Sequence, residues 1–199
     1  MKKKDNSLHL CVDYRGLNCI TWKNRYPIPL VSDLLDAPRK AQIYSKMNLR
    51  SAYHLVYIAQ GNEWKTLFRT HYSSYKWLVM PFGLSNVPFA FQRFINKIFS
   101  DLLDICIVIY LDNILIYSDN LEKHKDHIKE VLEQLRRHKL YASPTKYSFY
   151  QHEVEFLGFI LSPGELWMDP KKVQTIMEWP TLRWVRNIQA FLGFINFYR

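Results

Sequence analysis

The sequence predicts an α+β fold in which an antiparallel sheet carries helices on one face. Two short β-branched runs, 105–109 and 114–117, flank a polar Tyr-Leu-Asp-Asn segment at 110–113, a pattern typical of a hairpin. Two longer segments, about 87–103 and 121–138, repeat apolar residues at helical spacing. The order in which strands and helices follow one another indicates the α+β class.

The first 80 residues are predicted to form short elements separated by prolines and turn residues. Pro27 and Pro29 end regular structure, because proline fixes φ and lacks a backbone donor. Short apolar runs bounded by polar residues indicate strands. In chain order we expect a basic arm, a strand at 8–14, a loop to residue 30, a helix at 31–36, a strand at 43–48, a helical turn at 49–55, a strand at 55–58 and a hairpin from 64–69 to 75–79.

The remaining residues are predicted to form longer elements. The helix at 87–103 places a stripe of large apolar residues behind the sheet, and the helix at 121–138 has a similar stripe. A segment at 146–149, a strand at 154–161 and a helix at 171–179 are expected to follow. The two stripes are Phe91, Phe94, Ile95, Ile98, Phe99 and Leu102 in the first helix, and Ile128, Val131, Leu132 and Leu135 in the second.

Composition favours a packed domain with a polyanionic partner. The 199 residues are 48% hydrophobic and 16% aromatic, which supports a substantial core. The net charge of +9 favours nucleic acid, although a merely solvated basic surface is the alternative. No apolar run approaches the roughly 20 residues that cross a bilayer, and no apolar stretch follows the basic N-terminus as in a signal peptide. We therefore expect an intracellular protein without a membrane partner.

A histidine pair opens the second long helix. His124 and His127 have a spacing that can ligate a metal ion. No cysteine, third histidine or facing acid is evident nearby to complete such a site. Two histidines on the helix surface are the favoured interpretation.

Several ordered motifs carry a family resemblance. They are LCVDYRGLN at 10–18, YSKMNLRSAYH at 44–54, MPFGLSNVP at 80–88 followed by Phe91-Gln92, the Tyr-Leu-Asp-Asn tip at 110–113, and EFLG at 155–158. Together they closely resemble the reverse transcriptase of Ty3/gypsy-type long-terminal-repeat retrotransposons, from Lys2 to the last residue.

The resemblance implies the palm of a polymerase right hand with partial fingers. Residues 1–80 correspond to partial fingers with the first palm strand, and 81–165 to the palm with its acidic hairpin and primer-positioning strand. Residues 166–199 correspond to the start of the thumb or connection. We expect a truncated domain without a complete thumb, ribonuclease H, integrase or protease. The implied activity is RNA-directed DNA polymerisation, with an RNA template, a DNA primer, deoxynucleoside triphosphates and Mg²⁺.

The implied metal-binding positions are Asn48, Asp112 and Asn113, and only Asp112 is acidic. Taken alone, an Asp in a turn is more often a surface turn residue than a metal ligand. In the family all three positions are Asp. An amide offers one neutral oxygen where a carboxylate shares a full charge over two, and Mg²⁺ favours the carboxylate. Catalysis is therefore expected to be impaired.

Other residues match the family's substrate contacts. Tyr53 corresponds to the aromatic residue beneath the incoming sugar, with an ordinary core tyrosine as the alternative. His9 stands where the family has an arginine. It is expected to bind phosphate more weakly, since a neutral imidazole has one donor and lacks the charged guanidinium group. The implied nucleotide-binding residues are Lys3, His9, Tyr53, Phe82 and Lys146, and the implied template or primer residues are Asp13, Arg15, Phe156, Leu157 and Gly158.

Three functional hypotheses follow. The chain is an impaired descendant of an RNA-directed DNA polymerase, a binding module that engages nucleic acid without catalysis, or an expressed relic with no retained role. Oligomeric state is not indicated by any of these residues.

Overall fold

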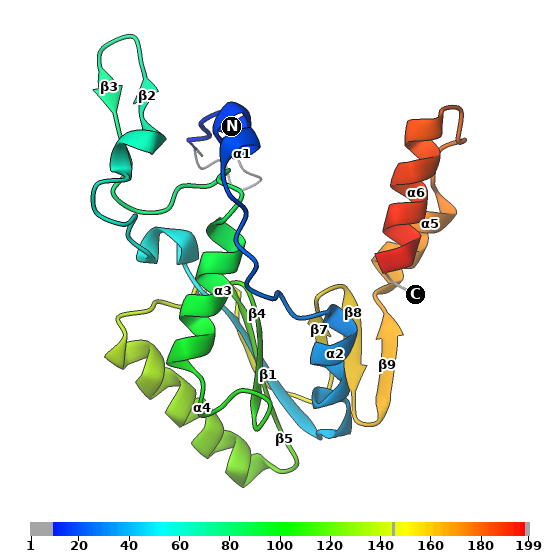
Figure 1. Ribbon diagram of the computed structural model, residues 1–199. Coiled ribbons are helices and arrows are strands. Elements are labelled where there is room, and N and C mark those ends of the chain that lie inside the picture. Colours follow the sequence, from blue (N-terminus) through cyan, green and yellow to red (C-terminus); the bar gives the residue numbers. More distant parts are fainter. Residues whose placement is uncertain (1–9, 145, 198–199) are drawn as a thin grey trace.

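The computed structural model describes residues 10–144 and 146–197. Its largest sheet is antiparallel, with strand order β4-β5-β1-β6 (Figure 1). The strands span Ile107–Tyr110 (β4), Asn113–Ser118 (β5), Ile43–Asn48 (β1) and Ser148–Gln151 (β6). β1 pairs with β5 along its whole length. The expected position of the 43–48 strand beside the acidic hairpin is confirmed.

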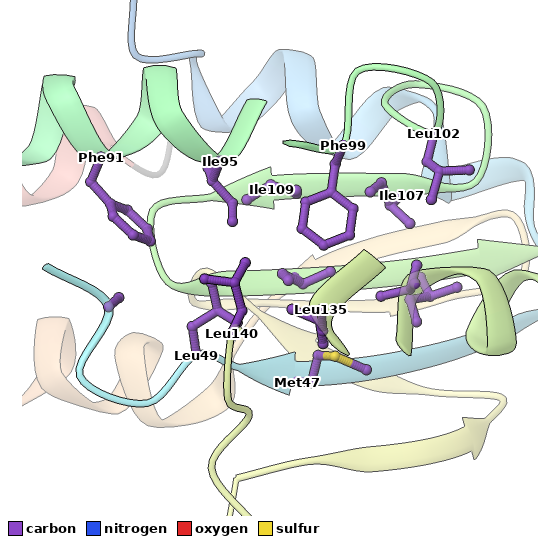
Figure 2. Close-up of a cluster of buried hydrophobic side chains, with 14 of the residues drawn as sticks. Met47, Leu49, Phe91, Ile95, Phe99, Leu102, Ile107, Ile109, Leu135 and Leu140 are labelled. Atoms are coloured by element: carbon purple, nitrogen blue, oxygen red, sulfur yellow. The ribbon is translucent and has the colours of Figure 1, made fainter. Parts of the chain in front are cut away.

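The helices α3 (Val87–Ile98) and α4 (Leu121–Arg137) cover one face of this sheet. Figure 2 shows Phe91, Ile95 and Phe99 reaching toward Ile107 and Ile109 on β4. Alternate strand residues meet one apolar stripe of each helix, as periods of two and 3.6 residues require. α3 ends earlier than predicted, because the chain reverses through a left-handed residue at 104, with φ of 60°, to enter β4.

The opposite face of the sheet is also covered, which corrects the expectation of helices on one face only. The short helix α2 (Val31–Asp36) packs there through Leu34 and Leu35 against Val108 and Leu115. A second sheet, β7 (Val154–Phe156), β8 (Phe159–Ser162) and β9 (Glu165–Met168), joins the same cluster. Both faces are covered because β4 and β5 carry apolar residues on each side of the sheet, so each face must be buried.

The N-terminal part differs from the predicted elements. Residues 10–14 form no strand, and a helix, α1 (Arg15–Ile20), follows them directly. The Asp13 carboxylate accepts the Arg15 backbone N–H at 3.0 Å, a local bond that competes with strand pairing.

Residues 38–79 contain short elements. Three 3₁₀ helices lie at Pro38–Lys40 (η1), Ala52–Leu55 (η2) and Glu63–Thr66 (η3), and η2 matches the predicted helical turn. The expected strand at 55–58 is reduced to a bridge between Tyr57 and Val79. The expected hairpin shrinks to β2 (Phe68–Arg69) and β3 (Ser74–Tyr75). The Thr66 hydroxyl donates to the Glu63 carbonyl at 2.7 Å, which favours the helical turn where a strand was expected.

The predicted strand at 154–161 is two strands. Leu157 and Gly158 have φ of 53° and 85°, the left-handed pair that a two-residue hairpin turn requires. The chain then forms β9, α5 (Pro170–Met177) and α6 (Val185–Phe197), which lie beyond the main sheet in Figure 1. β9 and α6 were not predicted. Within the described part of the chain, no helix is long and apolar enough to span a membrane.

The expectation that His124 lies on the helix surface is wrong. This residue is fully buried, and its ring nitrogens lie 2.7 Å from Ser45 Oγ and 2.8 Å from Ser118 Oγ. Ser118 Oγ also lies 2.7 Å from His127 Nδ1, and Ser45 Oγ accepts the Tyr150 backbone N–H. The apolar face of α4 extends back to its first turn, so His124 is buried between the helix and the sheet. Burial, followed by the neighbouring His127, lowers the pKa of His124 to about 4.

We predict that this buried imidazole makes folding stability sensitive to acid. The folded pKa of about 4 lies below the ordinary value of 6.5, so the unfolded chain binds the proton first. Stability is full above pH 6.5, falls as the pH drops toward 4, and is lower at pH 5 by about 2 kcal/mol. Urea unfolding at pH 7.5 and pH 5 measures this difference. His124→Gln should reduce it, whereas His138→Gln at the exposed end of α4 should not. An equal pH response in both variants would contradict the prediction.

Candidate functional site

Two asparagine side chains meet where β1 ends and β5 begins. Asn48 and Asn113 are register partners, so they lie on the same face of the sheet. Asn48 Nδ2 donates a hydrogen bond to Asn113 Oδ1 at 2.6 Å. An amide pair can bond in this way because one member donates and the other accepts. Two carboxylates at the same positions would repel each other unless a cation lay between them.

The turn of the acidic hairpin differs from the one expected. Of the four residues predicted for the tip, only Leu111 and Asp112 form the turn, because Tyr110 ends β4 and Asn113 begins β5. Leu111 has φ of 54°, the left-handed conformation that a tight hairpin turn demands. The Asp112 carbonyl accepts the Leu49 backbone N–H at 2.8 Å, which ties the turn to the end of β1.

The buried side chain of Gln92 holds this turn from behind. Its Oε1 accepts the Leu111 backbone N–H at 2.8 Å, and its Nε2 donates to the Ile109 carbonyl at 3.2 Å and to Asn96 Oδ1 at 2.8 Å. Gln92 is fully buried on α3. Gln92 therefore holds the hairpin turn against α3. It also stabilises Leu111 in its unfavourable left-handed backbone conformation.

A cleft of about 690 Å³ opens beside the asparagine pair. It gathers six of the residues predicted for the site, namely Asn48, Asn113, Lys146, Phe156, Leu157 and Gly158. Lys46, Lys172 and Glu155 also line it. The Lys46 ammonium donates to the Glu155 carbonyl oxygen at 2.6 Å, which holds the ammonium at the cleft wall. Lysine side chains and the two amides of Asn48 and Asn113 therefore line the same cleft.

Asp112 is not among the residues that line this cleft. Its carboxylate instead lies close enough to Tyr53 that its charge adds to burial in raising the pKa of that phenol. Tyr53 contacts Phe82 and Phe91 edge to face, with ring centroids 5.3 Å and 5.4 Å apart. The two predicted nucleotide-binding aromatics therefore touch each other next to the turn.

The remaining predicted residues lie elsewhere. Asp13 and Arg15 form an exposed ion pair with an N–O distance of 2.6 Å, and their hydrogen bonds lower the pKa of the Asp13 carboxyl to about 2. Neither residue lines the cleft. Lys3 and His9 lie outside the described residues.

Sequence reasoning missed three residues at this site. Gln92 follows Phe91 in one of the family motifs, and a polar residue within an apolar helical stripe is the sequence signal that indicates its role. Lys46 lies two residues before Asn48, and the strand period of two places them on one face. Lys172 had no local signal, because α5 reaches the cleft only through the chain reversal at β7 to β9.

Comparison with known proteins is consistent with this geometry. Residues 1–161 match the family described as reverse transcriptase (RNA-dependent DNA polymerase). The chain is 35% identical over 197 residues to the transposon Tf2-7 polyprotein of Schizosaccharomyces pombe and 34% identical to the Tf2-3 polyprotein. Each alignment covers 99% of this chain and 15% of the polyprotein. The chain thus spans about a seventh of the length of these relatives.

Solved structures show the same fold at lower identity. A foamy viral protease-reverse transcriptase in complex with double-stranded DNA superposes with a TM-score of 0.89 at 21% identity, covering 100% of this chain and 35% of that one. A foamy viral protease-reverse transcriptase with an RNA/DNA hybrid gives a TM-score of 0.81 at 21% identity, covering 94% and 25%. At this identity the likeness concerns the fold.

Proposed function

Because this chain belongs to the reverse transcriptase (RNA-dependent DNA polymerase) family, we propose that it is a retrotransposon-derived reverse transcriptase domain that still binds template-primer nucleic acid but is impaired in DNA synthesis. The observation that carries the proposal is the hydrogen bond between Asn48 and Asn113, two residues that line the cleft. Partial fingers at 1–80, a palm at 81–165 and the start of a thumb or connection at 166–199 are part of this proposal.

Impaired synthesis follows from the chemistry that the reaction needs. Phosphoryl transfer from a deoxynucleoside triphosphate requires the attacking hydroxyl and the leaving oxygen in line, with the developing charge neutralised. In this family Mg²⁺ supplies that neutralisation when it is bound. The residues here do not fit the ion: Asp112 is the single carboxylate of the set, and the other two members are amides bonded to each other. Within the described residues, no cluster of three or more His, Cys, Asp or Glu side chains could hold a metal.

Nucleic-acid binding is supported by features that do not depend on the metal. The chain carries a net charge of +9, and three lysines line the cleft. Two of the superposing foamy viral structures contain an RNA/DNA hybrid or double-stranded DNA. On this basis the proposed partners are an RNA template and a DNA primer, with deoxynucleoside triphosphates approaching Tyr53 and Phe82. A binding module without any synthesis is the second candidate, favoured by the same lysines.

A salt titration tests the binding half of the proposal. We expect fluorescence anisotropy to detect binding to a labelled RNA–DNA hybrid at about 50 mM salt, with affinity falling steeply as salt rises, because bound lysines release counterions. An acidic protein of similar size serves as the control and should bind more weakly. Undetectable or salt-independent binding would contradict the proposal and leave an expressed relic as the better description.

A further inference from the structure

The cleft beside the asparagine pair is a cationic site. Among the described residues that line it are Lys46, Lys146 and Lys172, against the single acid Glu155. Three positive charges against one negative give a formal excess of two. With aspartate at positions 48 and 113, as in the family, the same lining would be neutral. The two amides have therefore changed the charge balance of the cleft as well as removing metal ligands.

The three lysines reach the cleft from separate segments. Lys46 comes from β1, Lys146 from the segment before β6, and Lys172 from the first turn of α5. The Glu155 carbonyl uses one donor of the Lys46 ammonium, and an ammonium has three. Lys46 and Lys172 are partly buried, whereas Lys146 is exposed. Cations from three separate segments therefore line the same cleft as the two amides.

We propose that this cleft binds a phosphate group directly through its lysines, without a divalent metal ion. The inference rests on the proposed nucleic-acid-binding function for its natural ligand, a phosphodiester of a bound strand. The shared chemistry is a phosphate anion, which either a nucleic-acid backbone or a free polyphosphate supplies. A cleft holding two additional carboxylates would be formally neutral, and it would lose its net attraction for that anion until a metal ion bridged the carboxylates. The substitutions thus convert a metal-requiring site into a metal-independent one.

Inorganic tripolyphosphate in the presence of EDTA tests the cleft without nucleic acid. Isothermal titration calorimetry on the full chain should detect binding, and Lys46→Gln and Lys172→Gln should each weaken it about tenfold, the usual effect of losing one charged hydrogen bond. The matched control is Lys125→Gln with Lys129→Gln, two exposed lysines on α4 that do not line the cleft, which should leave the affinity within about twofold. Circular dichroism confirms that each variant folds. Absent binding, or equal weakening by the cleft and control variants, would overturn the inference.

The Asn48→Asp, Asn113→Asp double variant provides the opposite test. Its tripolyphosphate affinity in EDTA should fall at least tenfold and should recover when Mg²⁺ is added, whereas the unmodified chain should respond little to Mg²⁺. Equal metal dependence in both proteins would overturn the inference.

A parallel titration with an RNA–DNA hybrid in EDTA separates the two sources of phosphate. Hybrid binding that weakens in the cleft variants supports a backbone phosphate as the ligand. If the hybrid fails to bind while tripolyphosphate still does, the proposed function fails and the metal-independent cleft remains. If the hybrid binds equally to all lysine variants, the proposed function stands and the cleft inference is overturned.

Discussion

The unmodified chain is expected to extend no primer on an RNA template with either Mg²⁺ or Mn²⁺. Asp112 is the single carboxylate at the three family positions, and Asn48 and Asn113 bond to each other at 2.6 Å. Metal ions contribute several kcal/mol of charge stabilisation to phosphoryl transfer, and about 1.4 kcal/mol corresponds to a tenfold change in rate. The expected loss is therefore several orders of magnitude. A gel-based extension assay with a labelled primer measures it.

The Asn48→Asp, Asn113→Asp double variant should regain metal affinity before it regains synthesis. Without metal, the restored carboxylates repel each other, so its melting temperature should fall in EDTA and rise on addition of Mg²⁺. The unmodified chain should show little change between the two conditions. This readout does not depend on activity, which matters because the double variant is expected to polymerise poorly.

Asp112→Ala is the control for the extension assay. Robust template-dependent extension by the unmodified chain that Asp112→Ala abolishes would show that one carboxylate suffices, and would contradict the proposed impairment. Extension that is insensitive to Asp112→Ala would indicate a contaminating polymerase.

The second large effect is expected from Gln92→Leu. Leucine fills similar space but leaves the Leu111 N–H and the Ile109 carbonyl without their side-chain partner. An unsatisfied buried polar group costs about 1–3 kcal/mol, so the free energy of unfolding should fall by about 3 kcal/mol. Leu111 holds an unfavourable left-handed φ of 54°, and loss of its hydrogen bond should also release the turn. Urea unfolding measures the first effect and amide hydrogen exchange at Leu111 the second.

The matched control is Gln174→Leu. Gln174 lies on the exposed surface of α5, where its amide donates to Glu178. Its replacement should change the free energy of unfolding by no more than about 0.5 kcal/mol. Similar small losses in the two variants would mean that Gln92 does not support the hairpin.

Local sequence patterns determined which segments form the main elements. The apolar patterns of β1, α3, α4 and the β4–β5 hairpin are long enough to specify the element, and in the two helices they also specify the buried face. The family could also be predicted from the sequence, because it depends on residue identity at ordered positions. The extent of the hairpin within 64–79 and the predicted strand that includes 10–14 were not correctly predicted, since nearby side-chain hydrogen bonds compete with strand pairing there.

The tertiary structure decided which segments cover one another and which residues form hydrogen bonds between them. Apolar residues on both sides of β4 and β5 indicate burial but do not say what covers each face, and α2 with β7 and β8 proved to cover the second. The hydrogen bonds of Asn48 with Asn113, of His124 with two serines and of Leu111 with Gln92 depend on tertiary packing. The paired residues lie between 6 and 79 positions apart in the sequence. Lys172 reaches the same cleft as Lys46 only because the chain reverses between β7 and β9. Local periodicity predicts that a residue is buried or hydrogen-bonded. Which residue covers it or bonds to it is decided only when distant segments pack together.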